Sequence, residues 1–214
     1  MKVIVVGANG QIGKQVVEKL QDHSEHTVTA VVRKQEQVNE FKKKGIEAAL
    51  LDLEGKVDSL TEAFTGADAI IFAAGSGGHT GPDKTLLIDL DGAVKTMEAA
   101  EDAGVERYIL VSAYDADKRE NWNAEMRPYY VAKHYADRML EQSKLNYTIV
   151  RPGGLINEKA LGKVTVGVDA EPSTITREDV AEILVASLEE SGTYQKSFNV
   201  VNGTRSIKEA IKNI

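Results

Sequence analysis

The sequence predicts a doubly wound α/β domain, in which helices cover both faces of a parallel sheet. Short apolar runs alternate along the chain with segments whose apolar residues have helical spacing. The first apolar run, residues 3–6, leads directly into a glycine-rich turn. Neither a linker-like segment nor an internal repeat interrupts the alternation. We therefore expect a single domain over residues 1–214, with a core over 1–152 and a smaller substrate-side portion over 153–214.

The individual elements follow from apolar periodicity and from the residues that begin and end helices. Runs rich in β-branched residues predict strands over residues 3–6, 27–32, 48–51, 69–73, 108–111 and 148–150. Periodic segments between them predict helices over residues 11–21, 35–44, 84–103 and 128–143. Gly45 and Gly104 stand where C-cap glycines are expected. After Pro152 the pattern loosens, and we expect a helix over 177–188 with Thr176 as its N-cap, an extended segment over 197–201 and a helix over 206–211.

The composition is that of an ordinary globular protein and excludes several classes of function. Of the 214 residues, 42% are apolar and 28% are charged, and the net charge of −7 argues against a protein that holds nucleic acid by bulk electrostatics. The lack of cysteine excludes disulfides, thiol catalysis and thiolate metal sites. The four histidines show no ligand spacing backed by carboxylates, so we expect no metal site. The first apolar run is too short for a signal peptide or a membrane span, which favours a cytoplasmic protein without a membrane partner.

The segment G7-A-N-G-Q-I-G13 predicts a dinucleotide-binding turn between the first strand and the first helix. Gly7 would permit the tight turn, Gly10 would let the backbone approach a phosphate, and Gly13 would let the helix pack closely on the strand. The helix then presents unpaired N–H groups and its positive dipole end to a pyrophosphate. The coenzyme contacts expected here are Gly7, Asn9, Gly10, Gln11, Ile12 and Gly13. The alternative is an ordinary glycine-rich turn between a strand and a helix.

The end of the second predicted strand favours NADP over NAD. Proteins that prefer NAD usually place an acidic residue there for the ribose 2′-hydroxyl, whereas this chain has Arg33. The planar guanidinium of Arg33 can pair with a 2′-phosphate, with Lys34 in support. The alternative is a surface arginine that happens to end a strand.

Two further turns are expected to contact the coenzyme. Asp52, after the third strand, is placed to accept a hydrogen bond from the adenine amino group, and Leu53 would flank the ring. Ala73, Ala74 and Gly75 follow the fourth strand, where small residues would let the ribose lie against the backbone. A turn-forming aspartate and a merely flexible loop are the alternatives at these two places.

Several motifs together carry a resemblance to a known family. Besides the glycine-rich turn and A73-A-G-S-G-G78, they are L110-V-S-A113, Y129-Y-V-A-K133, Y147-T-I-V-R-P-G-G154 and T176-R-E-D-V-A181. Over nearly its whole length the chain resembles the short-chain dehydrogenase/reductase superfamily. Within it, the chain is most similar to atypical single-domain members, the NmrA-like or NAD(P)H-binding proteins, some of which are named sugar epimerases or dehydratases. The resemblance implies a Rossmann fold and a nicotinamide coenzyme.

The resemblance also implies a catalytic set of Ser112, Tyr129 and Lys133. Tyr129 and Lys133 are four residues apart and hence on one helix face, so the ammonium can lower the pKa of the phenol and hold ribose hydroxyls. Tyr129 would exchange a proton with a substrate oxygen that Ser112 steadies. Ser112 and Lys133 thereby also count as coenzyme contacts. The alternative is a chance Tyr-x-x-x-Lys pair, and the neighbouring Tyr130 competes for the tyrosine role.

Two other segments receive weaker expectations. Pro152 and Gly153 resemble the loop that contacts the nicotinamide in the family, although a plain strand-ending turn would look the same. Asn121 and Trp122 lie in a polar stretch over 114–127 that lengthens the interval between the serine and the tyrosine. They could line a substrate pocket, but a lone tryptophan more often has a packing role.

These expectations favour an NADP-dependent oxidoreductase that transfers hydride to or from a small carbonyl or a similar small-molecule substrate. A nucleotide-sugar epimerase or dehydratase is one alternative, although such enzymes usually carry a longer substrate domain after the core. A noncatalytic protein that senses NADP(H) and passes the signal to a protein partner is another. Members of the superfamily often pair through helices, so a homodimer is one expected form.

Overall fold

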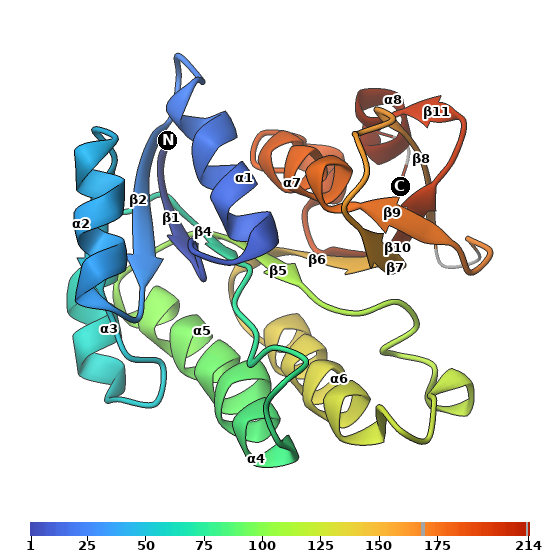
Figure 1. The fold of residues 1–214 in the computed structure, drawn as a ribbon, viewed down its shortest axis with the longest axis horizontal. Helices are drawn as coiled ribbons and strands as arrows, with labels where there is room; N and C mark the ends of the chain where they lie inside the picture. The colour runs from blue at the N-terminus through green and yellow to red at the C-terminus, as the bar shows by residue number, and fades with distance from the viewer. Residues whose placement is uncertain (168–169, 213) are drawn as a thin grey trace.

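A mostly parallel sheet forms the centre of the molecule (Figure 1). The structure is a computed structural model, and it describes residues 1–167, 170–212 and 214. In this part of the chain nine strands pair in the order β3-β2-β1-β4-β5-β6-β10-β8-β11, and the pairs that include β8 are antiparallel while the others are parallel. The strands are Lys2–Val6 (β1), Thr27–Val32 (β2), Glu47–Leu50 (β3), Ala69–Phe72 (β4), Arg107–Val111 (β5), Asn146–Pro152 (β6), Lys163–Gly167 (β8), Lys196–Asn202 (β10) and Arg205–Ser206 (β11).

Helices cover both faces of this sheet, which confirms the predicted doubly wound α/β fold (Figure 1). One apolar core lies under α1, α2, α7 and α8, and a second lies under α3, α5 and α6. The first core includes Leu20 and Phe198, and the second includes Phe64 and Leu140. The helices are Gln11–Gln21 (α1), Gln35–Lys43 (α2), Val57–Phe64 (α3), Ala93–Asp102 (α5), Arg127–Glu141 (α6), Arg177–Ala186 (α7) and Ile207–Lys212 (α8).

The residues that were expected to cap the helices do so. Gly45 and Gly104 have φ values of +74° and +72°, a left-handed conformation that costs glycine little and that ends α2 and α5. The next residue closes each cap, since the N–H of Ile46 donates to the Phe41 carbonyl at 3.1 Å. At the start of α7, the hydroxyl of Thr176 accepts the N–H of Asp179 at 2.9 Å.

Two helical segments differ from the sequence prediction. The helix α3 lies outside the predicted elements, because an eight-residue segment that buries only Leu60 and Phe64 has a weak periodic signal. The helix expected over 84–103 is divided into a short helix α4 (Pro82–Lys84), a π-helical segment η1 (Thr85–Gly92) and α5. A π-helix inserts an extra residue into a turn, and such insertions are frequent at functional sites.

The chain after Pro152 contains more strand than predicted. A small second sheet pairs β7 (Gly154–Ile156) with β9 (Thr174–Thr176), and β8 joins the main sheet beside β10. These strands are short and pair with distant segments, so the local sequence carries little signal for them. In the part of the chain that the structure describes, no helix combines the length and the apolar character needed to cross a membrane.

Candidate functional site

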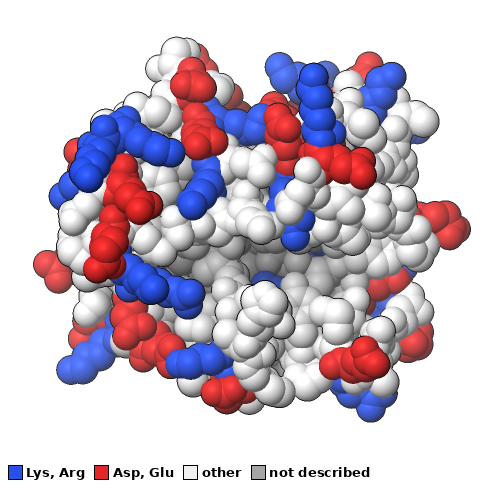
Figure 2. Space-filling model, viewed as in Figure 1, with Lys and Arg blue, Asp and Glu red and all other residues white. Residues whose placement is uncertain are grey.

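A pocket of about 340 Å³ opens beyond the carboxyl ends of β1, β2 and β4, at the point where the strand order reverses. Figure 2 shows this face of the molecule hollowed across its middle, between α1 and α7 on one side and α5 and α6 on the other. Nine of the predicted coenzyme contacts line the pocket together: Gly7, Asn9, Gly10, Arg33, Asp52, Leu53, Ala73, Ala74 and Gly75. Gln11, Ile12 and Gly13 form the first turn of α1 beside it.

Close backbone contacts at the mouth of the pocket require glycine at two of the predicted positions. Gly7 has a φ of +84°, and a Cβ added to it would lie 2.5 Å from the backbone nitrogen of Ala74. A Cβ added to Gly13 would lie 2.3 Å from the carbonyl oxygen of Gly7. The N-cap residue Gly10 provides no side-chain hydrogen bond, so the first N–H groups of α1 remain available to an anion. This cradle fits a pyrophosphate.

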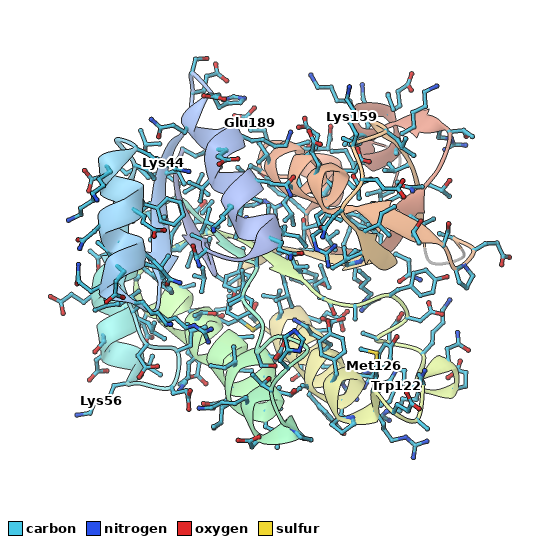
Figure 3. The ribbon with its side chains drawn as sticks, viewed as in Figure 1. Lys44, Lys56, Trp122, Met126, Lys159 and Glu189 are labelled. Atoms are coloured by element: carbon cyan, nitrogen blue, oxygen red, sulfur yellow. The ribbon has the colours of Figure 1, made fainter. Side chains whose placement is uncertain are left out.

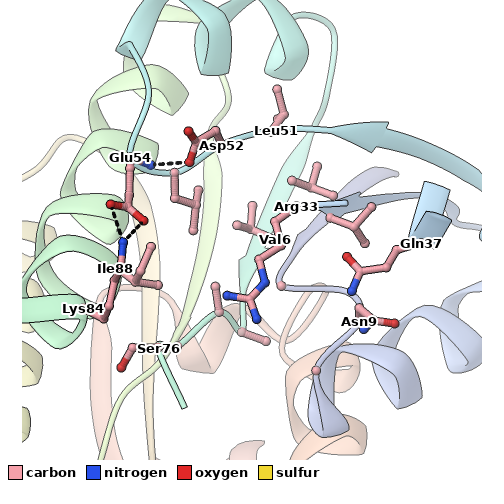
Figure 4. Close-up of a pocket in the computed structure, with 18 of the residues that line it drawn as sticks. Val6, Asn9, Arg33, Gln37, Leu51, Asp52, Glu54, Ser76, Lys84 and Ile88 are labelled. Carbon is pink, nitrogen blue, oxygen red and sulfur yellow. Dashed lines mark hydrogen bonds and ion pairs between the residues drawn. The ribbon is translucent and has the colours of Figure 1, made fainter. Parts of the chain in front are cut away.

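The charged side chains around the pocket have different partners (Figure 4). Lys84 donates to both carboxylate oxygens of Glu54, at 2.6 and 2.8 Å. Asp52 lines the pocket and also holds a turn, since its Oδ1 accepts the N–H of Glu54 at 3.0 Å. The guanidinium of Arg33 points into the pocket, and Arg33 takes part in none of the ion pairs formed within the described residues. Lys34 is the N-cap residue of α2 and does not line the pocket.

The three residues of the expected catalytic set lie at the end of β5 and in the first half of α6. The side chains of Ser112 and Lys133 are buried, whereas Tyr129 is half-buried. The ammonium of Lys133 donates to the carbonyl oxygen of Val111 at 3.1 Å, directly before Ser112. It also lies 5.7 Å from the centroid of the Tyr129 ring. The fold therefore brings Ser112, Tyr129 and Lys133 together at the carboxyl end of β5.

A carboxylate that the sequence analysis did not single out connects this set with the pocket. Asp89 lies in η1 and is only 2% exposed. Its Oδ1 is 3.4 Å from the ammonium of Lys133, and its Oδ2 accepts the backbone N–H of Ser76 at 3.0 Å. The one local signal for it is an aspartate within the apolar run L86-L-I-D-L90, since a buried charge requires a partner.

The pKa of Tyr129 is raised above its ordinary value, although Lys133 by itself lowers it as expected. Burial is the largest cause, and the charges of Asp89 and Asp137 together with Tyr130 add to it. Lys133 acts in the expected direction, but these effects outweigh it. For Lys133 itself, burial lowers the pKa, and the facing groups Tyr129, Asp89 and Asp137 more than offset this and raise it. The phenol is therefore protonated and the ammonium charged at neutral pH.

The polar stretch over 114–127 packs against the start of α6. The ring of Trp122 stacks on Tyr130 with 5.9 Å between centroids, and its Nε1 donates to the carbonyl oxygen of Asp115 at 3.2 Å. The side-chain amide of Asn121 donates to Oδ2 of Asp115 at 2.6 Å. Figure 3 shows Trp122 beside Met126, at the beginning of α6. These contacts give Trp122 the packing role that the sequence analysis set against a substrate-binding one.

Pro152 and Gly153 lie at the carboxyl edge of the sheet, and neither is among the residues that line the pocket. The N–H of Gly153 donates to the carbonyl oxygen of Val200 at 2.9 Å, and the carbonyl oxygen of Pro152 accepts the N–H of Tyr114 at 3.1 Å. The backbone N–H of Gly153 therefore already has a partner within the protein.

Comparison with known proteins agrees with this geometry. A family model described as NAD(P)H-binding matches residues 7–191. The chain belongs to this NAD(P)H-binding family. It is 52% identical to "Uncharacterized sugar epimerase YhfK" of Bacillus subtilis over 100% of both chains. Among solved structures, it is similar to a candidate NAD-dependent epimerase/dehydratase from Bacillus halodurans, with 41% identity, a TM-score of 0.93 and 100% of both chains covered. It is also similar to the oxidoreductase ylbE from Lactococcus lactis, with 34% identity, a TM-score of 0.91 and coverage of 100% of this chain and 96% of the other.

Membership in the NAD(P)H-binding family confirms the resemblance to atypical short-chain dehydrogenases/reductases with a Rossmann fold. It also supports an oxidoreductase-like or epimerase-like function that uses a nicotinamide coenzyme. The relatives' names differ between epimerase and oxidoreductase, so the choice between these activities depends on the residues of the site.

A buried ion pair of Arg151 and Asp137 lies next to Ser112 and Lys133. The Nε of Arg151 donates to Oδ2 of Asp137 at 2.9 Å, and Nη1 of Arg151 is 3.0 Å from Oδ2 of Asp117. Burial raises the pKa of Asp137 from 3.8 to about 6, although Arg151 and the hydroxyl of Ser112 act in the opposite direction. Asp137 therefore changes charge at about pH 6, within the range in which stability is ordinarily measured.

This shift predicts a pH dependence of stability that Asp137→Asn removes. Because the folded protein binds this proton more tightly than the unfolded chain, the contribution of Asp137 is complete below pH 3.8 and is lost as the pH rises through about 6. The shift of about two pH units corresponds to roughly 3 kcal/mol. Urea unfolding of both proteins between pH 4 and pH 7 should show the wild type losing about this much stability relative to the variant. A difference that stays constant over this range would contradict the assignment.

Proposed function

We propose that the protein is an NADP(H)-dependent reductase of a small carbonyl or quinone-like substrate. The observation that carries the choice of NADP is the position of Arg33. Lys84, the other cation that lines the pocket, is already paired with Glu54, whereas the guanidinium of Arg33 points into the pocket without an ion-pair partner among the described residues. A 2′-phosphate would supply the planar set of acceptor oxygens that a guanidinium binds best.

Each residue of the site would have a separate role in the reduction of the substrate. The first turn of α1 would hold the pyrophosphate, and Lys133 would hold ribose hydroxyls. Bound NADPH would supply a hydride from C4 of its nicotinamide. Tyr129, which keeps its proton at neutral pH, would donate that proton to the substrate oxygen. The hydroxyl of Ser112 would donate a hydrogen bond to the same oxygen and stabilise the charge that develops there.

The Arg33→Ala variant tests the choice of coenzyme. Loss of a charge-assisted hydrogen-bonding group of this kind costs about 1.5–3 kcal/mol, so we expect the Kd for NADPH to rise by roughly 10- to 100-fold. The Kd for NADH should change by less than about threefold, because NADH lacks the 2′-phosphate. Lys34→Ala is the matched control and should leave both values nearly unchanged, since Lys34 lies outside the pocket. Equal losses for NADPH and NADH in Arg33→Ala would contradict the proposal.

Net consumption of NADPH distinguishes reduction from epimerisation. A reductase oxidises one coenzyme for each substrate reduced, whereas an epimerase or dehydratase returns its coenzyme unchanged. We expect absorbance at 340 nm to fall in step with product when the wild-type protein turns over a carbonyl or quinone. Turnover of a nucleotide sugar with constant absorbance would instead establish the epimerase alternative.

A further inference from the structure

The proposed reductase function assigns no role to Asp89. This residue is buried in the π-helical segment η1, where it contacts Lys133 on α6 and the loop that follows β4. A buried charge is costly unless it is paired and hydrogen-bonded, and Asp89 satisfies both conditions. Its two oxygens have separate partners, the ammonium of Lys133 and the backbone N–H of Ser76.

We propose that Asp89 is a positioning residue: its negative charge compensates that of Lys133, so that Tyr129 gives up its proton less readily than it would beside Lys133 alone. The proton-donor role of Tyr129 rests on the reductase function proposed above. The offset of the Lys133 charge by Asp89 depends only on the protein, namely on Asp89, Lys133, Tyr129 and the backbone around them. It is therefore present without coenzyme or substrate.

The argument follows from the charges that face the Tyr129 ring. Lys133 is the cation near this ring, at 5.7 Å, and an uncompensated ammonium at that distance would favour the phenolate. Asp89 lies 3.4 Å from the same ammonium and presents the opposite charge. From α6 itself, Asp137 adds a second acidic group and Tyr130 a neutral neighbour, and both also disfavour the phenolate. The net charge around Tyr129 is therefore not positive, in contrast to a site in which the lysine acts alone.

The resulting step balances as a reduction. With NADPH bound as the hydride source, a C–H bond would form at the carbonyl carbon, and the electron pair of the C=O π-bond would move to the oxygen. The O–H bond of Tyr129 would break and a new O–H bond would form on the substrate, which would leave an alcohol, oxidised coenzyme and a phenolate beside Lys133. Water would return a proton to that phenolate, because Tyr129 is half-buried, while Asp89 keeps Lys133 in place between turnovers.

The Asp89→Asn variant tests this proposal, because the amide oxygen can still accept the N–H of Ser76 while the negative charge is lost. The readout is the titration of Tyr129 by ¹⁹F NMR in protein labelled with 3-fluorotyrosine, whose lower phenol pKa brings the titration into a range where the protein remains folded. The chain has seven tyrosines, and the resonance of Tyr129 is the one absent from Tyr129→Phe. We expect Asp89→Asn to lower the pKa of this residue by about one to two pH units. An unchanged titration in the folded variant would overturn the proposal.

A second pair of variants keeps the test decisive if Asp89→Asn does not fold, since it leaves Lys133 buried without its counter-ion. Lys133→Met retains Asp89 alone, and Asp89→Asn/Lys133→Met carries neither charge. We expect Tyr129 to titrate at a higher pH in Lys133→Met than in the double variant, and identical titrations would also overturn the proposal. Calorimetry of the wild type with NADPH is recorded in parallel. Absence of binding there would overturn the proposed function and leave the titration result standing, whereas normal binding with unchanged titrations would overturn the role of Asp89 alone.

Discussion

Replacing Gly13 with alanine is expected to weaken coenzyme binding by about 100-fold or more. The added Cβ would lie 2.3 Å from the carbonyl oxygen of Gly7 and 2.9 Å from its carbonyl carbon, so α1 must move away from the end of β1. Displacement of a binding group by about 1 Å costs on the order of 100-fold, and we expect at least this rise in the Kd for NADPH. Overpacking of this kind should also reduce the free energy of unfolding by about 1–3 kcal/mol.

The control for this variant is Gly78→Ala. Nothing lies within 4 Å of a Cβ added to Gly78, and its φ is not in the left-handed region, so stability and binding should both stay near wild type. Calorimetry with NADPH and urea unfolding measure the two effects. Wild-type affinity in Gly13→Ala would show that the α1 turn is not the phosphate site.

The Tyr129→Phe variant is expected to lose most of its turnover while it retains its coenzyme. Removal of the phenol deletes the group that donates the proton, and loss of general acid catalysis typically lowers kcat by about 10²- to 10⁴-fold. The Kd for NADPH should change by less than about twofold, because the pocket is lined by other residues. Steady-state kinetics with a carbonyl or quinone that the wild type reduces, together with calorimetry, separate these two quantities.

Tyr130→Phe is the matched control for this experiment. Its ring stacks on Trp122, so the variant should keep most of its activity and test the competing assignment of the tyrosine. High activity in Tyr129→Phe combined with a large loss in Tyr130→Phe would exchange the roles of the two residues. High activity in both would contradict general acid catalysis by a tyrosine of this motif.

The parts of the fold with strong local signals could be predicted from the sequence. The helix over Gln11–Gln21 has the predicted bounds, because a glycine-rich turn precedes it and its apolar residues repeat at helical spacing. The strands β1 and β4 are continuous apolar runs, which is typical of parallel strands that are buried on both faces. Since the turns after these strands meet at one edge of the sheet, the positions of Arg33 and Asp52 in a common pocket followed from the strand order.

The remaining features depend on contacts between distant residues. The pairing of β8 with β10 and the interruption of the helix over 84–103 by η1 have no periodic signature. The pair of Asp89 and Lys133 joins two segments that approach only after η1 packs on α6. The pKa of Tyr129 also depends on contacts between distant residues. The four-residue spacing places Lys133 near the ring, but it gives no information about the burial of Tyr129 or about its distance from Asp89.

A crystal structure of the protein with NADP tests the central claim most directly. We expect the pyrophosphate to accept N–H groups from the first turn of α1, the 2′-phosphate to lie within hydrogen-bond distance of Arg33, and C4 of the nicotinamide to face Tyr129. A coenzyme bound elsewhere, or one whose 2′-phosphate points away from Arg33 into solvent, would contradict the account.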